Sequence, residues 1–168
     1  MQKENVFILA ILVKNEAGVL NRVTSLFARR GYNIDTLSVG ETEQENVSRI
    51  TVTARGTDRM RRQILTQTEK LEDVITAGII DGESAVLREL MLIKISADST
   101  RRSEILAAVS VFRAKVVDMT PQSLTMEITG ERGKCDAFVE YLKPFGIAEL
   151  CRTGITAMTR GQTTLTNG

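Results

Sequence analysis

The chain has 168 residues, with 22 basic and 21 acidic side chains and a formal net charge of +1 at pH 7. A chain of this length forms one domain or two small ones and can bury a core without disulfides or metal ions. The near balance of charge argues against a general nucleic-acid or anionic-membrane binder, because such proteins rely on accumulated positive charge. We therefore expect no nucleic acid and no membrane among its partners.

The chain contains no histidine and only two cysteines, Cys135 and Cys151. It therefore lacks the usual imidazole acid or base and the commonest protein ligand for metals. Two cysteines so far apart form no C-x-x-C site, and without histidine they cannot build a typical zinc site. We expect two reduced thiols and no metal site.

The first half of the chain predicts six alternating elements. The run Val6–Val13 is apolar at every position, which indicates a strand that is buried on both faces. It is too short to span a membrane, and no cleavage-site pattern follows it, so we expect a cytoplasmic protein. The predicted ranges are a strand at 6–13, a helix at 17–30, strands at 33–41 and 47–54, a helix at 58–72 and a strand at 73–80.

Local signals support these ranges. In the first helix, one stripe of apolar side chains is expected to face the core; its members are Val19, Leu20, Val23, Leu26 and Phe27. Gly31 follows Arg29 and Arg30 and is typical of a helix C-terminus. Asp58 is expected to cap the second helix. The order β-α-β-β-α-β predicts a ferredoxin-like domain.

The second half repeats the same order. It predicts a strand at 90–96, a helix at 101–113, strands at 115–119 and 123–129, a helix at 134–143 and a strand at 147–152. We therefore expect an α+β protein of two consecutive ferredoxin-like βαββαβ domains, at 1–80 and 90–168, with 81–89 as a linker. The polar tail from Thr159 is expected to fray.

The loop Asn15–Leu20 connects the first strand to the first helix and carries the strongest chemical signal. Gly18 lets a ligand approach the backbone closely, and the amides of Gly18, Val19 and Leu20 would face an anion at the positive end of the helix. Val19 and Ile34 would give apolar walls, and with Asn33 from the segment after the helix these parts suit a small zwitterion with an aliphatic side chain. On spacing alone, however, the pattern favours an ordinary tight turn, in which Asn15 caps the helix and Gly18 eases the turn.

Other sites are less well supported by the sequence. The loop lacks the spaced glycines of phosphate-binding motifs. The arginines at 59, 61 and 62 form a basic cluster, but the strand 47–53 lacks the aromatic residues with which ferredoxin-like sheets bind RNA. A solvated helix face accounts better for these arginines.

Several segments resemble signature segments of the ACT domain and, more closely, the small regulatory subunit of acetolactate synthase. In the first half these are N-E-A-G-V-L-N-R-V at 15–23, R-G-Y-N-I-D-T-L at 30–37 and S-R-I-T at 48–51. In the second half, R-E-L-M-L-I-K-I at 88–95, V-D-M-T-P at 117–121 and G-K-C-D-A-F at 133–138 are similar to the C-terminal domain of that family. The resemblance covers nearly the whole chain in the right order.

The resemblance implies a non-catalytic subunit with no cofactor of its own. Thiamine diphosphate, magnesium and FAD are expected on a separate catalytic large subunit, which this chain would activate and make sensitive to feedback inhibition by valine. Residues 1–80 would form an ACT domain that pairs into a homodimer and binds valine between two copies. The site implied by position consists of Asn15, Ala17, Gly18, Val19 and Leu20 of one copy and Asn33 and Ile34 of the other. The alternative is a free-standing ACT-type amino-acid sensor that regulates another protein.

Overall fold

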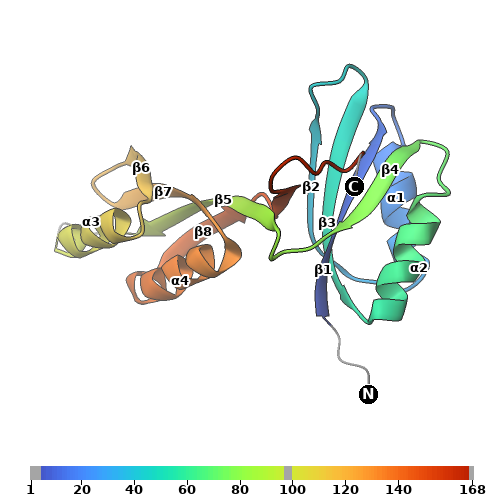
Figure 1. The fold of residues 1–168 in the computed structure, drawn as a ribbon. Helices are drawn as coiled ribbons and strands as arrows, with labels where there is room; N and C mark the ends of the chain where they lie inside the picture. The colour runs from blue at the N-terminus through green and yellow to red at the C-terminus, as the bar shows by residue number, and fades with distance from the viewer. Residues whose placement is uncertain (1–4, 97–99, 167–168) are drawn as a thin grey trace. The chain divides into compact units, whose positions relative to one another are not determined.

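The computed structural model describes residues 5–96 and 100–166 and divides into two compact units (Figure 1). The first unit contains the chain up to Leu87 together with the segment from Ile155 onward, and the second unit spans Arg88–Gly154. The chain therefore leaves the first unit once and returns to it. We call residues 155–166 the tail segment.

The first unit is a four-stranded antiparallel sheet with two helices on one face (Figure 1). The strand order is β2-β3-β1-β4, so that β1 and β3 are central and β2 and β4 lie at the edges. The elements are β1 (Asn5–Lys14), α1 (Val19–Ala28), β2 (Ile34–Glu41), β3 (Val47–Gly56), α2 (Asp58–Thr68) and β4 (Val74–Ile80).

The apolar stripe of α1 packs on the sheet as its spacing predicts, with one exception. Val19, Val23, Leu26 and Phe27 are buried in a cluster that includes Leu9 of β1. Leu20, which was expected on the same stripe, is 40% exposed. Since the wide stripe of a helix can have an exposed margin, Leu20 is free to contact something other than this core.

The face of the sheet opposite the helices is covered by the chain's own tail segment. Ile8 and Ala10 of β1 are buried there against Ile155 and Ala157, and Leu165 packs at the margin. The tail segment contains the short strand β9 (Thr156–Thr159), which pairs with β5 (Ala85–Ser96). Alternate apolar residues, Ile155 and Ala157, therefore cover the second apolar face of β1. The segment expected to fray begins only at Thr159, the last residue of β9, and within it Leu165 packs on this face.

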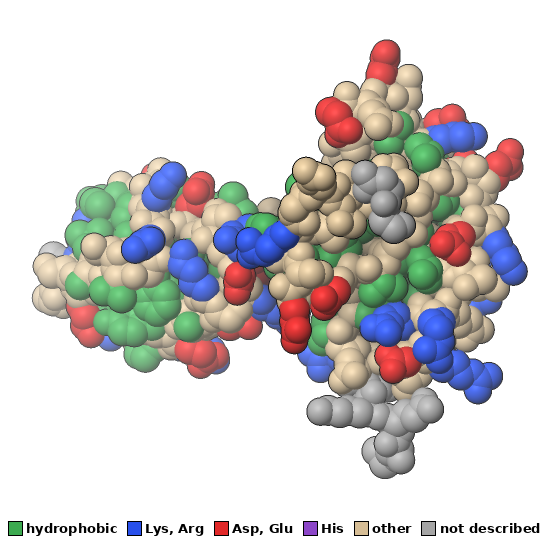
Figure 2. All heavy atoms as spheres, viewed as in Figure 1, with side chains coloured by type: hydrophobic (Ala, Val, Ile, Leu, Met, Phe, Trp, Pro, Cys, Tyr) green, Lys and Arg blue, Asp and Glu red, His purple; other side chains and the backbone are tan. Residues whose placement is uncertain are grey.

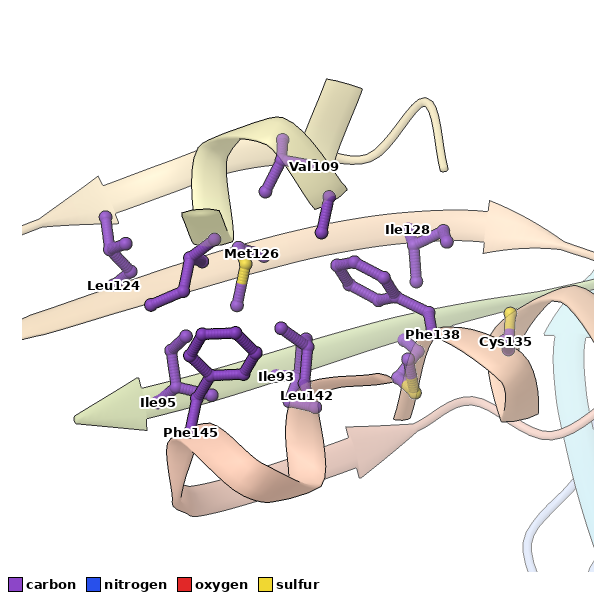
Figure 3. Packing of buried hydrophobic residues seen from close by; sticks show 13 residues of the cluster. Ile93, Ile95, Val109, Leu124, Met126, Ile128, Cys135, Phe138, Leu142 and Phe145 are labelled. Atoms are coloured by element: carbon purple, nitrogen blue, oxygen red, sulfur yellow. The ribbon is translucent and has the colours of Figure 1, made fainter. Parts of the chain in front are cut away.

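The second unit has the same plan, with strand order β6-β7-β5-β8 and two helices on one face. Figure 3 shows its core, where Phe138 and Leu142 of α4 point at side chains of β5 and β7. The elements are β5 (Ala85–Ser96), α3 (Arg102–Val111), β6 (Lys115–Met119), β7 (Ser123–Gly130), α4 (Arg132–Leu142), the 3₁₀ turn η1 (Lys143–Phe145) and β8 (Ile147–Arg152).

The expected fold class is confirmed: the chain is an α+β protein of two ferredoxin-like units. Two domain boundaries differ from the expected ones. Residues 85–89, expected in a linker, belong to strand β5, and the tail segment, expected in the second domain, packs with the first. The cap of α2 is Thr57 rather than Asp58, since the Thr57 side chain accepts a hydrogen bond from the Met60 amide.

Both cysteines are free thiols, with Cys135 buried in the second unit and Cys151 exposed. Within the described ranges, no helix is long and apolar enough to cross a bilayer.

Candidate functional site

The loop between β1 and α1 makes a tight turn that requires glycine. Gly18 precedes α1 with φ 86° and ψ −11°, a left-handed conformation that other residues adopt at a cost. Asn15 does not cap the helix as one interpretation of the sequence expected. Its backbone amide donates to the Asn46 carbonyl at 2.7 Å and its side-chain Nδ2 donates to Glu41 Oε1 at 3.0 Å. Asn15 therefore fixes the loop to the β2–β3 hairpin.

The helix N-terminus at this loop leaves backbone donors available. The Val19 amide makes only a long bond of 3.4 Å to the Glu16 carbonyl. Among the described residues, the amides of Gly18 and Leu20 find no acceptor. Such donors, together with the helix dipole, favour an anion at this end. The loop is exposed at Asn15, Ala17, Gly18 and Leu20, so a ligand can reach it.

The side chain of Val19 does not line this loop. It is 3% exposed and belongs to the core beneath α1, so Val19 offers a ligand only its backbone. The exposed side chain of Leu20 is the apolar group at this position. The sequence-based assignment of Val19 as an apolar wall was therefore wrong, because the same side chain is required by the helix–sheet core.

Asn33 and Ile34 lie at the other end of the sheet from the loop. Lys14, just before the loop, pairs with Val47 of β3, whereas Ile34 pairs with Ala54. The seven residue steps from Val47 to Ala54 separate the two groups by roughly 23 Å along the strand. Asn33 is exposed and its Nδ2 donates to Asp35 Oδ1 at 3.2 Å, while Ile34 is half-buried. One copy of the chain does not bring the expected site residues together.

An ion pair braces the first turn of α1. Arg22 Nε lies 2.5 Å from Asp73 Oδ2 in the connection before β4, and the Asp73 carbonyl accepts from the Lys14 amide at 2.9 Å. A Cβ added at Gly18 would lie 3.2 Å from Arg22 Nη1, which is a tight contact with a flexible side chain. The end of β1, the loop and the start of α1 are thus held as one rigid group.

Strand β2 forms an open edge of the first sheet. It pairs with β3 on one side, from Ile34 to Glu41, and no described strand pairs with its other side. Val39 in this strand is 46% exposed. An edge with free backbone donors and acceptors is suited to pairing with another chain.

Sequence reasoning missed Arg49 as a residue of interest, although it lies in the segment S-R-I-T. Arg49 is on β3 and extends across the helix-free face, where its Nη2 donates to the Ala157 carbonyl at 2.7 Å. The available signal was that Arg49 is the only charged residue in the otherwise apolar and threonine-rich run 47–54. The sequence alone did not show which residue Arg49 would contact, because that contact lies in the distant tail segment.

Comparison with known proteins identifies the family of this chain. Residues 88–161 match the family described as the small subunit of acetolactate synthase, and residues 9–76 match its ACT domain. The chain is 47% identical over 159 residues to the "Probable acetolactate synthase small subunit" of Methanothermobacter thermautotrophicus, covering 94% of this chain and 95% of that protein. It is 46% identical over 153 residues to the acetolactate synthase small subunit of Mycobacterium bovis, covering 91% of each.

A solved structure agrees over nearly the full length. The acetolactate synthase small subunit from Thermotoga maritima superposes with a TM-score of 0.89 and 38% identity, covering 95% of this chain and 99% of that chain. Both halves of the sequence, both folded units and two nearly full-length relatives point to the same family. The chain belongs to the family of acetolactate synthase small subunits.

Proposed function

We propose that this chain is the regulatory subunit of an acetolactate synthase in branched-chain amino-acid biosynthesis and works in the cytoplasm. It would raise the activity of a catalytic large subunit and make that subunit sensitive to inhibition by valine. Catalysis, with thiamine diphosphate, magnesium and FAD, would belong to the large subunit. The observation that carries the proposal is the nearly full-length identity of 46–47% to acetolactate synthase small subunits.

The valine site would be shared by two copies of the first unit. If two β2 edges pair antiparallel about a two-fold axis, the Glu41 end of one strand lies beside the Ile34 end of the other. Because Asn15 bonds to Glu41 within its own chain, this pairing places the Asn15–Leu20 loop of one copy beside the partner's Asn33 and the partner's Ile34. The separation of these two groups within one copy supports the dimeric site.

The chemistry of the combined site suits valine. The free amides of Gly18 and Leu20 would receive the carboxylate of the ligand at the helix N-terminus. The side-chain oxygen of the partner's Asn33 would accept a hydrogen bond from the ammonium group. The exposed Leu20 and the partner's Ile34 would contact the aliphatic side chain, for which burial of each methylene is worth about 0.8 kcal/mol.

Inhibition requires that valine bind the inhibited assembly more tightly than the active one. A tenfold preference corresponds to about 1.4 kcal/mol, which a few amide contacts can supply. Since the site would span two copies, valine would also stabilise the dimer by mass action. We therefore expect the dimer to persist to lower protein concentrations on dilution when valine is present.

Reconstitution with a large subunit tests the proposal. The purified chain is mixed with the acetolactate synthase large subunit from the same genome, and pyruvate consumption is measured with and without valine. We expect a higher rate with the chain present and a valine-dependent fall of that rate. If neither the rate nor the valine response changes, the chain is better explained as a free-standing amino-acid sensor.

A further inference from the structure

A cavity of about 490 Å³ lies on the helix-free face of the first unit. Its walls come from β1, the β2–β3 hairpin and the tail segment, which runs across the sheet in dark red in Figure 1. Leu12, Val47, Met158 and Leu165 supply apolar surface. A cavity of this volume is in the range of small-molecule sites, and it forms within one chain rather than between two.

Arg49 contributes an uncompensated positive charge to this cavity. Its Nη2 donates to the Ala157 carbonyl, its Nε is buried without a partner, and within the described ranges no carboxylate lies in salt-bridge distance. Burial lowers the pKa of the Arg49 guanidinium, which shows that its charge is partly removed from water. A half-buried cation without a counter-ion is costly, and an anion beside it would offset that cost.

Two hydroxyl groups that line the cavity are already engaged by the protein. The Thr42 hydroxyl donates to the Val47 carbonyl at 3.1 Å, and the Thr159 hydroxyl donates to the Thr163 carbonyl at 2.7 Å. Nη1 of Arg49, in contrast, makes no hydrogen bond with the described residues and is not enclosed. The guanidinium is therefore a charged donor that the cavity offers to a ligand.

Two acidic residues of the β2–β3 hairpin are among the residues that line the cavity. Glu41 and Glu43 line the cavity, and Figure 2 shows acidic side chains gathered at the tip of the β2–β3 hairpin. Glu41 already accepts a hydrogen bond from Asn15, whereas Glu43 is exposed and has no ion-pair partner in the described ranges. The Glu43 carboxylate would repel a multiply charged anion, but it would accept a hydrogen bond from an ammonium group.

We propose that this cavity binds a small aliphatic carboxylate, with Arg49 as its anion-binding group and the apolar wall around Leu12 and Met158 holding the aliphatic part. An α-amino acid and its 2-oxo acid share this chemistry. The ammonium of an amino acid would face Glu43, whereas a 2-oxo acid would rely on Arg49 alone. The site is separate from the loop at Gly18, and its existence does not depend on the proposed function.

Methyl NMR of the full-length chain tests this site directly. Met158 lines the cavity and is 62% exposed, whereas Met119 lies in the second unit and is 49% exposed. The chain, labelled with ¹³C at its methionine methyl groups, is titrated with L-leucine and, in a second arm, with 4-methyl-2-oxopentanoate. We expect a saturable shift of the Met158 signal with at least one probe and no shift of Met119. No saturable shift of Met158 with either probe would overturn the proposal.

Four variants separate this site from simpler explanations. Arg49→Gln should weaken the binding seen at Met158 about tenfold, since it removes a charge-assisted hydrogen bond. The matched control Thr156→Val removes another contact of the tail segment, to Ser38, but leaves the cavity lining intact, so its affinity should match that of the wild type. Equal loss in both variants would mean that Arg49 only anchors the tail segment, and would contradict the proposal.

Glu43→Gln and Gly18→Asp complete the test. Glu43→Gln removes a negative charge from the cavity lining without breaking a contact, so it should strengthen binding of 4-methyl-2-oxopentanoate and weaken that of L-leucine. Unchanged affinity for both probes would place the ligand away from Glu43 and contradict the proposal. In Gly18→Asp the Met158 shift should persist. Its disappearance there, with persistence in Arg49→Gln, would assign the ligand to the loop instead.

Discussion

The Ala157 carbonyl accepts a hydrogen bond of 2.7 Å from Arg49, which precedes it by 108 residues. Two further hydrogen bonds fix the same segment, from the Ile155 amide to Thr36 and between Ser38 and Thr156. Beneath them, Ile8 and Ala10 are buried against Ile155 and Ala157. The tail segment therefore completes the first unit, although it follows the whole second unit in the sequence.

We expect Ala157→Asp to destabilise the first unit strongly. Ala157 is 1% exposed, and burying an unpaired carboxylate there should cost about 3 kcal/mol or more of unfolding free energy. Met158→Asp is the matched control, because that neighbouring side chain is 62% exposed and its change should stay within about 0.5 kcal/mol. Urea unfolding followed by circular dichroism measures both. Equal stability of the two variants would show that the tail segment does not cover the sheet in solution.

Cys135 should resist alkylation while the chain is folded. Burial, with a smaller contribution from Glu89, raises the pKa of the Cys135 thiol from 9.0 to about 11. At pH 8 only about one thiol in a thousand is then ionised, and the thiolate is the reactive form. In a Cys151→Ser variant, iodoacetamide at pH 8 should label the chain in urea but not in buffer. Rapid labelling of the folded variant would contradict the burial of Cys135.

The same pKa shift predicts a loss of stability at alkaline pH. The stabilisation is fully present below pH 9, where the thiol is neutral in both states, and it is lost as the pH rises from 9 towards 11, because the unfolded thiol ionises first. Replacing Cys135 by Ala removes this group and should flatten the fall in melting temperature over that interval. A parallel fall in both proteins would assign the alkaline loss to other groups.

Much of the fold could be predicted because its elements carry strong periodic signals. The apolar run of β1, the stripe of α1 and the glycine at Gly18 each define an element or a turn from local chemistry. The tail segment could not be predicted in this way, since Ile155 and Ala157 are isolated apolar residues in a polar stretch. Its signal was indirect: β1 is apolar on both faces, so something had to cover the second face.

The candidate site was predictable in composition but not in geometry. The motif identified Gly18, Leu20 and Asn33, but only the register of β1 and β2 on β3 shows that the loop and Asn33 lie at opposite ends of the sheet. Val19 illustrates a conflict that the sequence alone did not resolve. The same side chain was assigned to the helix stripe and to the pocket wall, and packing in the core requires it on the stripe.

Gly18→Asp should abolish inhibition by valine and leave activation of the large subunit intact. The new carboxylate would occupy the helix N-terminus where we place the carboxylate of the ligand, and like charges there disfavour binding. Valine inhibition curves of the reconstituted enzyme measure the effect. The control Gly146→Asp places the same side chain at another glycine of positive φ, 84°, in the second unit, and its ψ of 93° lies outside the left-handed helical region, so the backbone strain there is at least as large. Full valine sensitivity in Gly18→Asp would reject the assignment of this loop.

Mixed dimers decide whether the loop and Asn33 act across two copies. Gly18→Asp and Asn33→Ala chains should each fail to bind valine alone, because the first fills the place of the ligand's carboxylate and the second removes the acceptor for its ammonium group. After unfolding and refolding together, half of the dimers are mixed, and each mixed dimer regains one intact site, formed by the unmodified loop of one chain and the unmodified Asn33 of the other. Calorimetry should then find about a quarter of the wild-type number of sites.

The reciprocal mixture provides the control for this experiment. A chain carrying both substitutions is refolded with an equal amount of wild-type chain, so that every mixed dimer has one defect in each of its two sites. If the site spans two copies, the number of sites falls on mixing from about half to about a quarter of the wild-type value. If the site lies within one chain, that number stays at about half and the first mixture never regains binding, because each chain then keeps its own complete or defective site.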